Sequence, residues 1–164
     1  MIELMPVEIA NLQLFKTVRL RALEESPSAF GSTYAREVQF DDEEWTKRAL
    51  RWNGERGIGY LAVESGVGCG IAGALLDSFD ESRADLVSMW TAPTHRRLGV
   101  GKLLVEAVMS WARQRGVGTL RLMVTSSNEA AIAFYLRLGF AMTGHTEPYP
   151  NDPALIEYEM VIFL

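Results

Sequence analysis

Apolar residues recur at the three- and four-residue spacing of an amphipathic helix in two stretches of the chain. The stronger stripe begins after Gly99 and stops before Gly116, a residue type that commonly ends helices. The other begins near Pro6, which suits the first turn of a helix, and runs to about Glu25. We therefore expect two helices that each bury one face. Their apolar positions are Val100, Leu103, Leu104, Ala107, Val108, Trp111 and Ala112 in the stronger stripe, and Ile9, Leu12, Phe15, Val18 and Ala22 in the other.

Two further helices are indicated by their first turns. Asp41–Glu44 form an acid-rich turn of the kind that stabilises a helix start. Ser126 and Glu129 have the spacing of a capping box, in which Ser126 caps a helix over Ala130–Leu138 and Glu129 reaches back. Ala29–Gln39 has no clear period, and we interpret it as a loop or a short helix.

Alternating or continuous apolar runs between turn signals predict the strands. Ser65–Gly68 is typical of a hairpin turn. Pro93 ends the predicted strand Leu86–Thr91. A turn-rich loop, Thr146–Pro153, is expected between the last two strands. The predicted strands are Ile2–Met5, which we place at a sheet edge, then Ile58–Glu64, Cys69–Phe79, Leu86–Thr91, Thr119–Thr125, Phe140–Gly144 and Ile156–Ile162.

Composition narrows the class of protein. No apolar run reaches the length of a membrane span, and Met1–Pro6 lacks the basic and apolar regions of a signal peptide. The single cysteine, Cys69, cannot form an internal disulfide or a cysteine-based metal cluster. There is no internal repeat or linker. We expect one domain over residues 1–164, cytoplasmic, with no membrane partner and no bound metal.

Charge is distributed unevenly along the chain. The net charge of −5 argues against nucleic-acid binding as the main task. From Arg96 to Arg121, however, Glu106 is the only acidic residue, and six are Arg or Lys. A locally basic segment in an acidic protein suits a small anionic ligand.

The basic segment opens with a glycine pair at a predicted helix start. Gly99 and Gly101 let the backbone approach a ligand closely, and the first turn of the helix has N–H groups without intrahelical partners. Free donors at the positive end of the helix dipole bind anions such as pyrophosphate. A dinucleotide fingerprint would need a third glycine at Leu104, and a Walker A loop would need glycine at Arg96 and Ser or Thr at Leu103. An ordinary basic helix start is the alternative interpretation.

Two motifs in order identify a family resemblance. The first is Arg-x-x-Gly-x-Gly over Arg96–Gly101, after a strand and a proline. The second is Asn…Ala…Tyr…Gly-Phe over Asn128–Phe140, which follows the next strand. Together they resemble the GCN5-related N-acetyltransferase (GNAT) family. The resemblance implies an α/β (α+β) fold with a mixed, mostly antiparallel sheet of about six to seven strands, splayed at its centre and flanked by about four helices.

The resemblance also implies a cofactor site for acetyl-CoA as co-substrate. The strand that ends in Thr91 would expose backbone groups to the pantetheine arm, the next turn would hold the pyrophosphate, and Asn128 would bond the pantetheine amides. Tyr135 would lie near the sulfur. For Asn128 a capping role can coexist with binding. The cofactor-binding residues implied are Met89, Trp90, Thr91, Arg96, Arg97, Leu98, Gly99, Val100, Gly101, Lys102 and Asn128.

The chemistry of acetyl transfer assigns further roles. Attack of a neutral amine on a thioester gives an oxyanion, which a strand N–H near Met89–Thr91 would stabilise. The departing thiolate needs a proton, and a phenol with a pKa of about 10 remains protonated to supply it. We expect Tyr135 to be this general acid; a packed core aromatic is the other interpretation.

The general base has several candidates. Some peptide acetyltransferases of this family carry Glu where this chain has Met123, a departure that weakens a ribosomal-protein or peptide N-terminus interpretation. Glu37 is slightly favoured, because it lies in the region that shapes the acceptor pocket in relatives; a base reached through water is equally open. Cys69 is expected to be a buried strand residue and His95 a solvated loop residue. The other candidates, each of which could equally be a surface residue, are Asp85, Glu157, Glu159 and His145.

The sequence therefore predicts an acyl-CoA-dependent N-acyltransferase, acetyl being the expected group, that acts by direct attack in a ternary complex. The acceptor is expected to be a small-molecule or peptide amine, selected by the loops around Ala29–Gln39 and Thr146–Pro153. A non-catalytic acyl-CoA sensor and a purely structural domain are the alternatives. An exposed final strand could pair with a second copy to form a homodimer.

Overall fold

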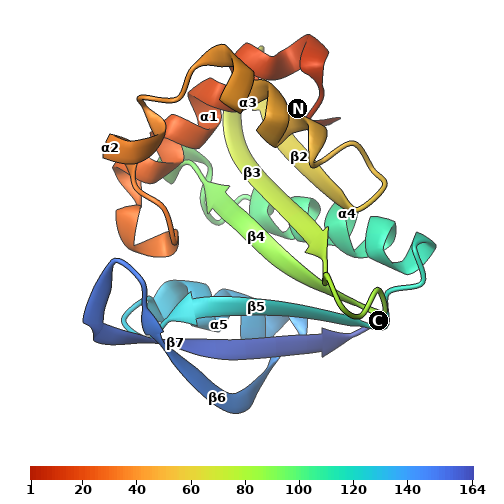
Figure 1. The fold of residues 1–164 in the computed structure, drawn as a ribbon, viewed down its shortest axis with the longest axis vertical. Coiled ribbons are helices and arrows are strands. Elements are labelled where there is room, and N and C mark those ends of the chain that lie inside the picture. The colour runs from red at the N-terminus through yellow and green to blue at the C-terminus, as the bar shows by residue number, and fades with distance from the viewer.

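The structure is a computed structural model that describes residues 1–164. Seven strands form one sheet in the order β1-β2-β3-β4-β5-β7-β6, shown in Figure 1. All neighbours are antiparallel except β4 and β5, which are parallel. The sheet is thus mixed and mostly antiparallel, as expected. The strands are β1 (Glu3–Pro6), β2 (Gly57–Glu64), β3 (Val67–Leu76), β4 (Arg83–Thr91), β5 (Thr119–Thr125), β6 (Ala141–Tyr149) and β7 (Asp152–Phe163).

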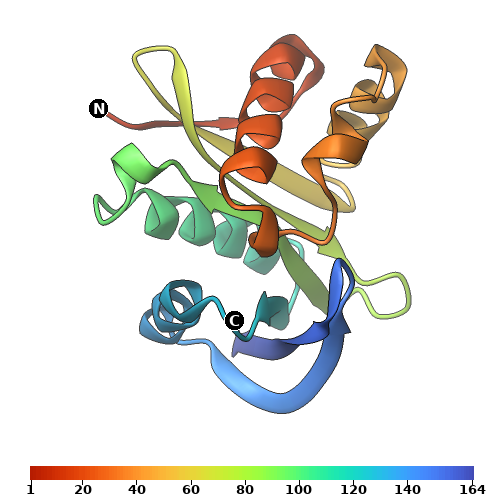
Figure 2. The ribbon, with the colours of Figure 1, turned by 90° about the vertical axis from the view of Figure 1, so that its left-hand side faces the viewer.

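Helices cover both faces of the first half of the sheet. Figures 1 and 2 show α4 behind β2, β3 and β4, whereas α1 and α3 lie on the opposite face. None of the helices has the length and hydrophobicity that a membrane crossing requires. The helices are α1 (Leu12–Glu25), α2 (Tyr34–Glu37), α3 (Asp42–Leu50), α4 (Val100–Gln114) and α5 (Glu129–Leu138), with 3-10 turns η1 (Ile9–Asn11), η2 (Pro27–Ala29) and η3 (Pro93–His95).

The centre of the sheet splays apart. The parallel pairing joins Arg83–Asp85 to Thr119–Arg121 and ends there. Further along β4, Ser88 has a φ of +59°, and the register against β3 shifts near this residue. Such a bulge increases local bending, so β4 and β5 diverge toward their carboxyl ends, as Figure 1 shows. The edge of β4 that faces β5 is therefore unpaired from Leu86 to Thr91.

The glycines of β2 and β3 make room for core side chains. A Cβ on Gly59 would lie 1.9 Å from the Trp52 ring, and one on Gly73 would lie 2.4 Å from it. A Cβ on Gly68 would lie 2.1 Å from Val18 of α1. These glycines serve packing, in agreement with the hairpin interpretation of this region.

The N-terminal part of the chain differs from the expected boundaries. Pro6 is the last residue of β1, and the α-helix begins only at Leu12, after η1. The interpretation of Pro6 as a first helical turn was wrong, because β1 extends through Pro6 in its pairing with β2. An edge strand tolerates proline, since one side of its backbone has no partner.

Three boundaries in the rest of the chain also differ. The capping box at Ser126 is wrong: Asn128 caps α5, and its Oδ1 accepts a hydrogen bond from the Ala131 N–H at 3.2 Å. β4 begins at Arg83, earlier than predicted, because it pairs there with both neighbours. The loop expected over Thr146–Pro153 is mostly strand, because β6 and β7 form a long hairpin that turns after Tyr149. The final strand, which was expected to be exposed and able to pair with a second copy, is β7, and it is paired on both sides, by β5 and by β6. That expectation was wrong, because β6 forms this edge of the sheet.

A buried ion pair joins the first three helices. Glu37 of α2 has no exposed surface, and its two carboxylate oxygens accept hydrogen bonds from Arg19 of α1, both at 2.9 Å. Arg48 of α3 lies 3.7 Å from the same carboxylate. Burial opposes ionisation, but the hydrogen bonds and charge of Arg19 and the charge of Arg48 outweigh it and lower the pKa of Glu37. Glu37 is therefore a structural anchor.

Glu37→Gln is expected to lower the free energy of unfolding by about 3 kcal/mol or more at neutral pH, because it leaves the buried Arg19 charge uncompensated. Urea denaturation measures this difference. The difference should shrink as the pH falls from 4.5 through the lowered pKa, since the wild-type carboxylate then becomes protonated.

Glu44→Gln is the matched control, because Glu44 pairs with the same Arg48 at 3.3 Å on a more exposed surface. Its effect should remain within about 0.5 kcal/mol. Equal effects of the two substitutions would show that the buried pair does not anchor the helices.

Candidate active site

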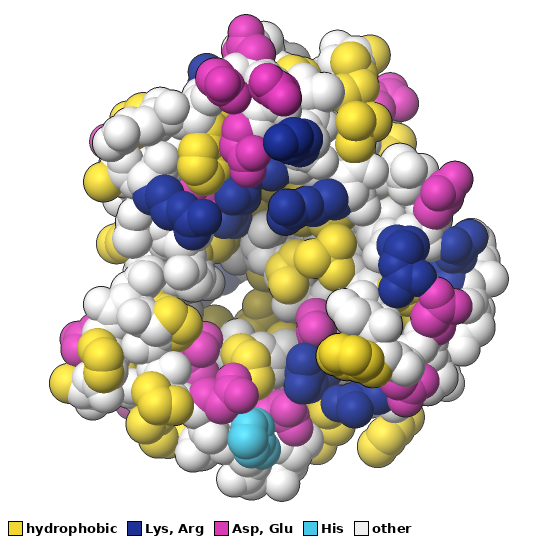
Figure 3. All heavy atoms as spheres, viewed as in Figure 1, with side chains coloured by type: hydrophobic (Ala, Val, Ile, Leu, Met, Phe, Trp, Pro, Cys, Tyr) yellow, Lys and Arg dark blue, Asp and Glu magenta, His cyan; other side chains and the backbone are white.

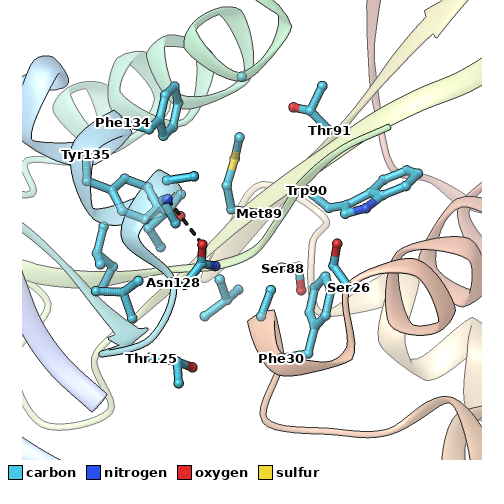
Figure 4. A pocket seen from close by; sticks show the side chains of 18 of the residues that line it. Ser26, Phe30, Ser88, Met89, Trp90, Thr91, Thr125, Asn128, Phe134 and Tyr135 are labelled. Carbon is cyan, nitrogen blue, oxygen red and sulfur yellow. Dashed lines mark hydrogen bonds between the residues drawn. The ribbon is translucent and has the colours of Figure 1, made fainter. Parts of the chain in front are cut away.

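A cleft of about 1680 Å³ occupies the space where β4 and β5 diverge. Its lining comes from the loop around η2, from β4, from the start of α4, from β5, α5 and β7. Figure 4 shows side chains from both halves of the sheet turned into it. The splay thus creates a site between elements that are far apart in sequence.

The turn before α4 presents unpaired amides to this cleft. None of the main-chain N–H groups from Arg96 to Lys102 donates a hydrogen bond within the protein. Arg97 and Gly99 have φ values of +64° and +84°, and Gly99 is the N-cap of α4. Free donors at the positive end of a 15-residue helix form an anion site.

Most of the residues expected in this turn line the cleft, namely Arg96, Arg97, Gly99, Gly101 and Lys102. Their two neighbours in the turn do not. Leu98 is 68% exposed, and Val100 is buried in the core. Any contribution of these two to binding would come from the main chain.

Gly101 lies against the wall of the cleft. A Cβ at this position would lie 3.1 Å from both Met89 Cε and Phe134 Cζ. Figure 4 shows the Met89 side chain directed toward Phe134. A larger side chain at position 101 would have to displace these neighbours or project into the cleft.

The three basic side chains of the turn differ in their contacts. Arg96 Nε donates to the Thr91 carbonyl at 3.0 Å, and its guanidinium pairs with Glu25 of α1. Lys102 lies 3.8 Å from Glu106 in an exposed pair. Arg97 lines the cleft and has no hydrogen-bond or ion-pair partner, so its side chain and the main-chain amides are the groups free to contact an anion.

The three expected β4 residues contribute differently. The Trp90 indole turns away from the cleft and donates to Glu25 at 3.0 Å, so only its main chain is available. Met89 and Thr91 line the cleft. Thr91 Oγ1 is buried and has no hydrogen-bond partner.

Asn128 and Tyr135 of α5 both line the cleft. Because Asn128 Oδ1 caps the helix, its Nδ2 group is left to donate elsewhere (Figure 4). Tyr135 is 7% exposed and packs edge-on against Phe140 at 5.6 Å between ring centroids. Burial raises the pKa of the Tyr135 phenol far above its ordinary value, so it carries its proton throughout the neutral range. Tyr135 is thus a packed aromatic that also lines the cleft, and its role as general acid stays a prediction.

The candidate bases differ in whether they line the cleft and whether an arginine is paired with them. Glu37 was the favoured one, and this expectation was wrong, because its carboxylate is enclosed by Arg19 and Arg48 and does not line the cleft. Asp85 lines the cleft, but it accepts a hydrogen bond from Arg121 at 2.7 Å.

The remaining candidates lie on the β6–β7 hairpin. Glu159 lies 3.4 Å from Arg121, and His145 pairs with Glu147 at 3.4 Å outside the cleft. Glu157 lines the cleft and has no Arg or Lys partner. Burial and the adjacent Glu147 carboxylate, opposite it across the strands, raise the pKa of Glu157. A carboxylate with a raised pKa in a cleft is suited to accept a proton.

Cys69 is buried as expected, whereas His95 is partly buried and hydrogen-bonded where a solvated loop residue was expected. Cys69 is buried in β3, and burial raises the pKa of its thiol. His95 lies at the cleft rim, 3.2 Å from Glu64. No group of three or more His, Cys, Asp or Glu side chains is placed to hold a metal ion.

Two contributions to the site were not found in the sequence. Phe134 lies against Gly101 and lines the cleft, although no motif in the sequence singled it out. Tyr149 and Asn151 reach the loop around η2 and hydrogen bond to its carbonyls. No local sequence pattern predicts these contacts, because the hydrogen-bonded partners are 119 to 121 residues apart in the chain.

The chain is similar in sequence to known acetyltransferases. The family model described as the acetyltransferase (GNAT) family matches residues 19–140. A [ribosomal protein bS18]-alanine N-acetyltransferase of Escherichia coli K12 is 34% identical over 99 residues, 58% of this chain and 64% of the relative. Streptothricin acetyltransferase of Streptomyces lavendulae is 42% identical over 62 residues, 38% of this chain and 33% of the relative. The chain thus spans less than two thirds of either relative.

Solved structures share the fold at low sequence identity. A GNAT-family acetyltransferase from Streptococcus pneumoniae superposes with a TM-score of 0.83 at 22% identity, covering 100% of this chain and 99% of that one. The PaiA N-acetyltransferase of Thermoplasma acidophilum, solved with coenzyme A, gives a TM-score of 0.75 at 15% identity, covering 100% and 99%. Because the family model covers most of the chain, including the glycine turn and α5, this protein belongs to the GNAT family of acetyltransferases.

Proposed function

We propose that this protein transfers an acetyl group from acetyl-CoA to a primary amine of a small molecule or peptide, by direct attack in a ternary complex. One observation carries the proposal: a single cleft joins a row of unpaired amides at the start of α4 to the buried, protonated phenol of Tyr135. The amides suit a diphosphate, and the phenol suits a departing thiolate.

The unpaired features of the cleft fit the intervening part of coenzyme A. The free edge of β4 over Leu86–Thr91 offers main-chain groups to an extended arm that carries amides, as an added strand would. Asn128 Nδ2 offers a further hydrogen bond. The free β4 edge and this amide group are therefore the groups that a pantetheine arm would satisfy.

The relatives support the reaction class and leave the acceptor open. The E. coli relative is named for a ribosomal-protein alanine and the S. lavendulae relative for streptothricin, so their acceptors differ in kind. Met123 stands where some peptide acetyltransferases of the family carry Glu. We therefore assign the proton-accepting role to another residue of this chain.

Glu157 is the proposed general base. An amine attacks only in its neutral form, so a group in the cleft must take its proton. Glu157 lines the cleft without a cationic partner, and its raised pKa makes it a better acceptor than an ordinary glutamate. A main-chain N–H on β4 near Met89 would stabilise the oxyanion, and Tyr135 would protonate the thiolate.

Wild-type protein with acetyl-CoA is expected to release thiol with at least one member of a broad panel of primary amines. Tyr135→Phe should lower kcat by about 100-fold, because the proton donor is lost while the ring packing remains. Following free thiol measures both rates, and calorimetry should show an unchanged affinity for coenzyme A.

Two other outcomes would contradict the proposal in different ways. Tight coenzyme A binding without thiol release over the whole panel would indicate an acyl-CoA sensor. No binding of coenzyme A at all would indicate a structural or interaction domain.

Gly101→Asp is expected to abolish coenzyme A binding, because the new side chain crowds Met89 and Phe134 and adds negative charge beside the amides. Calorimetric titration with coenzyme A measures the loss. Gly118→Asp is the control, because a Cβ there has no heavy atom closer than 3.9 Å and the position lies outside the cleft. Both variants should fold, and normal binding by Gly101→Asp would show that the diphosphate lies elsewhere.

Glu157→Gln is expected to lower kcat/KM by about 100-fold or more, because the base is removed. In the wild type, kcat/KM should fall as the pH drops through the raised pKa of Glu157. Glu147→Gln removes the neighbouring negative charge and so lowers that pKa, which moves the acid limb to lower pH. The pH profile of kcat/KM with one amine measures the shift.

Glu43→Gln on the exposed first turn of α3 is the control for this series, since it removes the same charge far from the cleft. His145, Glu159 and Arg121 also lie near the hairpin carboxylates and stay unchanged in each variant. An acid limb that is identical in wild type and Glu147→Gln would exclude Glu157 as the titrating base.

A further inference from the structure

Two segments from opposite ends of the chain are tied together beside the cleft. The Tyr149 hydroxyl donates to the Phe30 carbonyl at 2.6 Å and lies 3.1 Å from the Pro27 carbonyl. Asn151 Nδ2 lies 3.1 Å from the Phe30 carbonyl and 3.3 Å from that of Ser32. We call these two segments, residues 27–32 and 149–151, the strap.

The strap is fixed at both sides. Tyr149 and Phe30 are each only 4% exposed, and the Arg19 guanidinium lies over the Phe30 ring at 4.9 Å. Thr125, at the end of β5, adds a hydrogen bond from its buried hydroxyl to the Ser28 carbonyl at 2.8 Å. A segment held by buried side chains from several elements is a fixed wall, unlike a mobile lid.

The strap closes the cleft on the side that the sheet leaves open. At one end, the cleft is limited by the pairing of Arg83–Asp85 with Thr119–Arg121. At the other end, where β4 and β5 are farthest apart, the hairpin tip of β6 and β7 meets the loop around η2 (Figure 1). Figure 3 shows a hollow enclosed between these parts of the surface. The cleft is thus bounded all around, as a channel is.

A bounded channel restricts how an acceptor reaches the thioester. The unpaired amides of Arg96–Lys102 lie on the α4 side, so coenzyme A would fill that mouth. The acceptor must then enter through the other mouth, end-on, because the strap prevents a longer molecule from lying across the cleft from the side. A substituent close to the amine would meet the strap.

We propose that the strap makes this protein selective for amines carried at the end of a slender, unbranched arm, with Tyr149 and Asn151 as the positioning residues that hold residues 27–32 in place. This inference rests on the proposed function, because it concerns the acceptor of that reaction. Its physical basis is steric: residues 27–32 line the cleft, and the hydrogen bonds of Tyr149 and Asn151 prevent them from moving aside for a branched substrate. The small residues Ser28, Gly31 and Ser32 that line the cleft leave room for the arm itself.

The test compares isomers. Short straight-chain monoamines and diamines are each paired with the isomer branched at the nitrogen-bearing carbon, and kcat/KM is measured by thiol release. Wild type should prefer the straight isomer by roughly tenfold or more. Asn151→Ala, at an exposed position, and Tyr149→Phe, which keeps the buried ring, should raise kcat/KM for the branched isomers and reduce that ratio severalfold.

Tyr60→Phe is the matched control, because Tyr60 lies in β2 outside the cleft lining, and it should leave the ratio unchanged. A merely structural role of the strap would lower the rates of both isomers together without changing their ratio. A wild-type ratio near one, or a ratio that neither strap variant reduces, would overturn the inference while leaving acetyl transfer intact. Thiol release with no amine of any pair would instead remove the proposed function and the inference with it.

Discussion

The fold depends on where the pairing between β4 and β5 stops. Neighbouring parallel strands normally satisfy each other's main-chain hydrogen-bonding groups along their length, but here the ladder ends at Asp85 and Arg121. Beyond that point, Leu86–Thr91 keeps partners on the β3 side alone. Because buried backbone groups need hydrogen bonds, this edge is stable only beside solvent or a ligand. The interrupted ladder therefore creates the space of the cleft and leaves main-chain groups of Leu86–Thr91 free to hydrogen bond to an extended ligand.

The groups around the glycine turn differ in whether they are free to contact an anion. The sequence predicted that main-chain amides of the glycine turn bind an anion and that Arg96, Arg97 and Lys102 add positive charge around it. In the structure, Arg96 fixes the turn by pairing with Glu25 and by bonding the Thr91 carbonyl, and Lys102 pairs along its helix with Glu106. The contacts of Arg96 with β4 and α1 hold the turn in place. The helix start itself then supplies the field for an anion, and it needs no reorganisation of long side chains.

Local sequence signals predicted the elements that hold the cofactor side of the site. The apolar stripe after Gly99 gave α4, and the run Thr119–Thr125 gave β5 with its observed bounds. The acceptor side was not predictable in this way. Glu37 was expected to be a base because nothing in the sequence shows that Arg19, 18 residues earlier, encloses it. The loop expected over Thr146–Pro153 is mostly strand because the pairing of β6 with β7 overrides its turn residues. This hairpin carries Tyr149 to a partner 119 residues away.

Burial gives the two proposed proton-transfer groups their properties. It favours the neutral form of any acid, so it raises the pKa of both Tyr135 and Glu157. For the phenol, which packs against Phe134 and Phe140, the shift guarantees a proton to donate. For the carboxyl, burial and the charge of Glu147 increase its affinity for a proton. The cleft thus holds a proton donor on α5 and a proton acceptor on β7, which is the division of roles that acyl transfer to an amine requires.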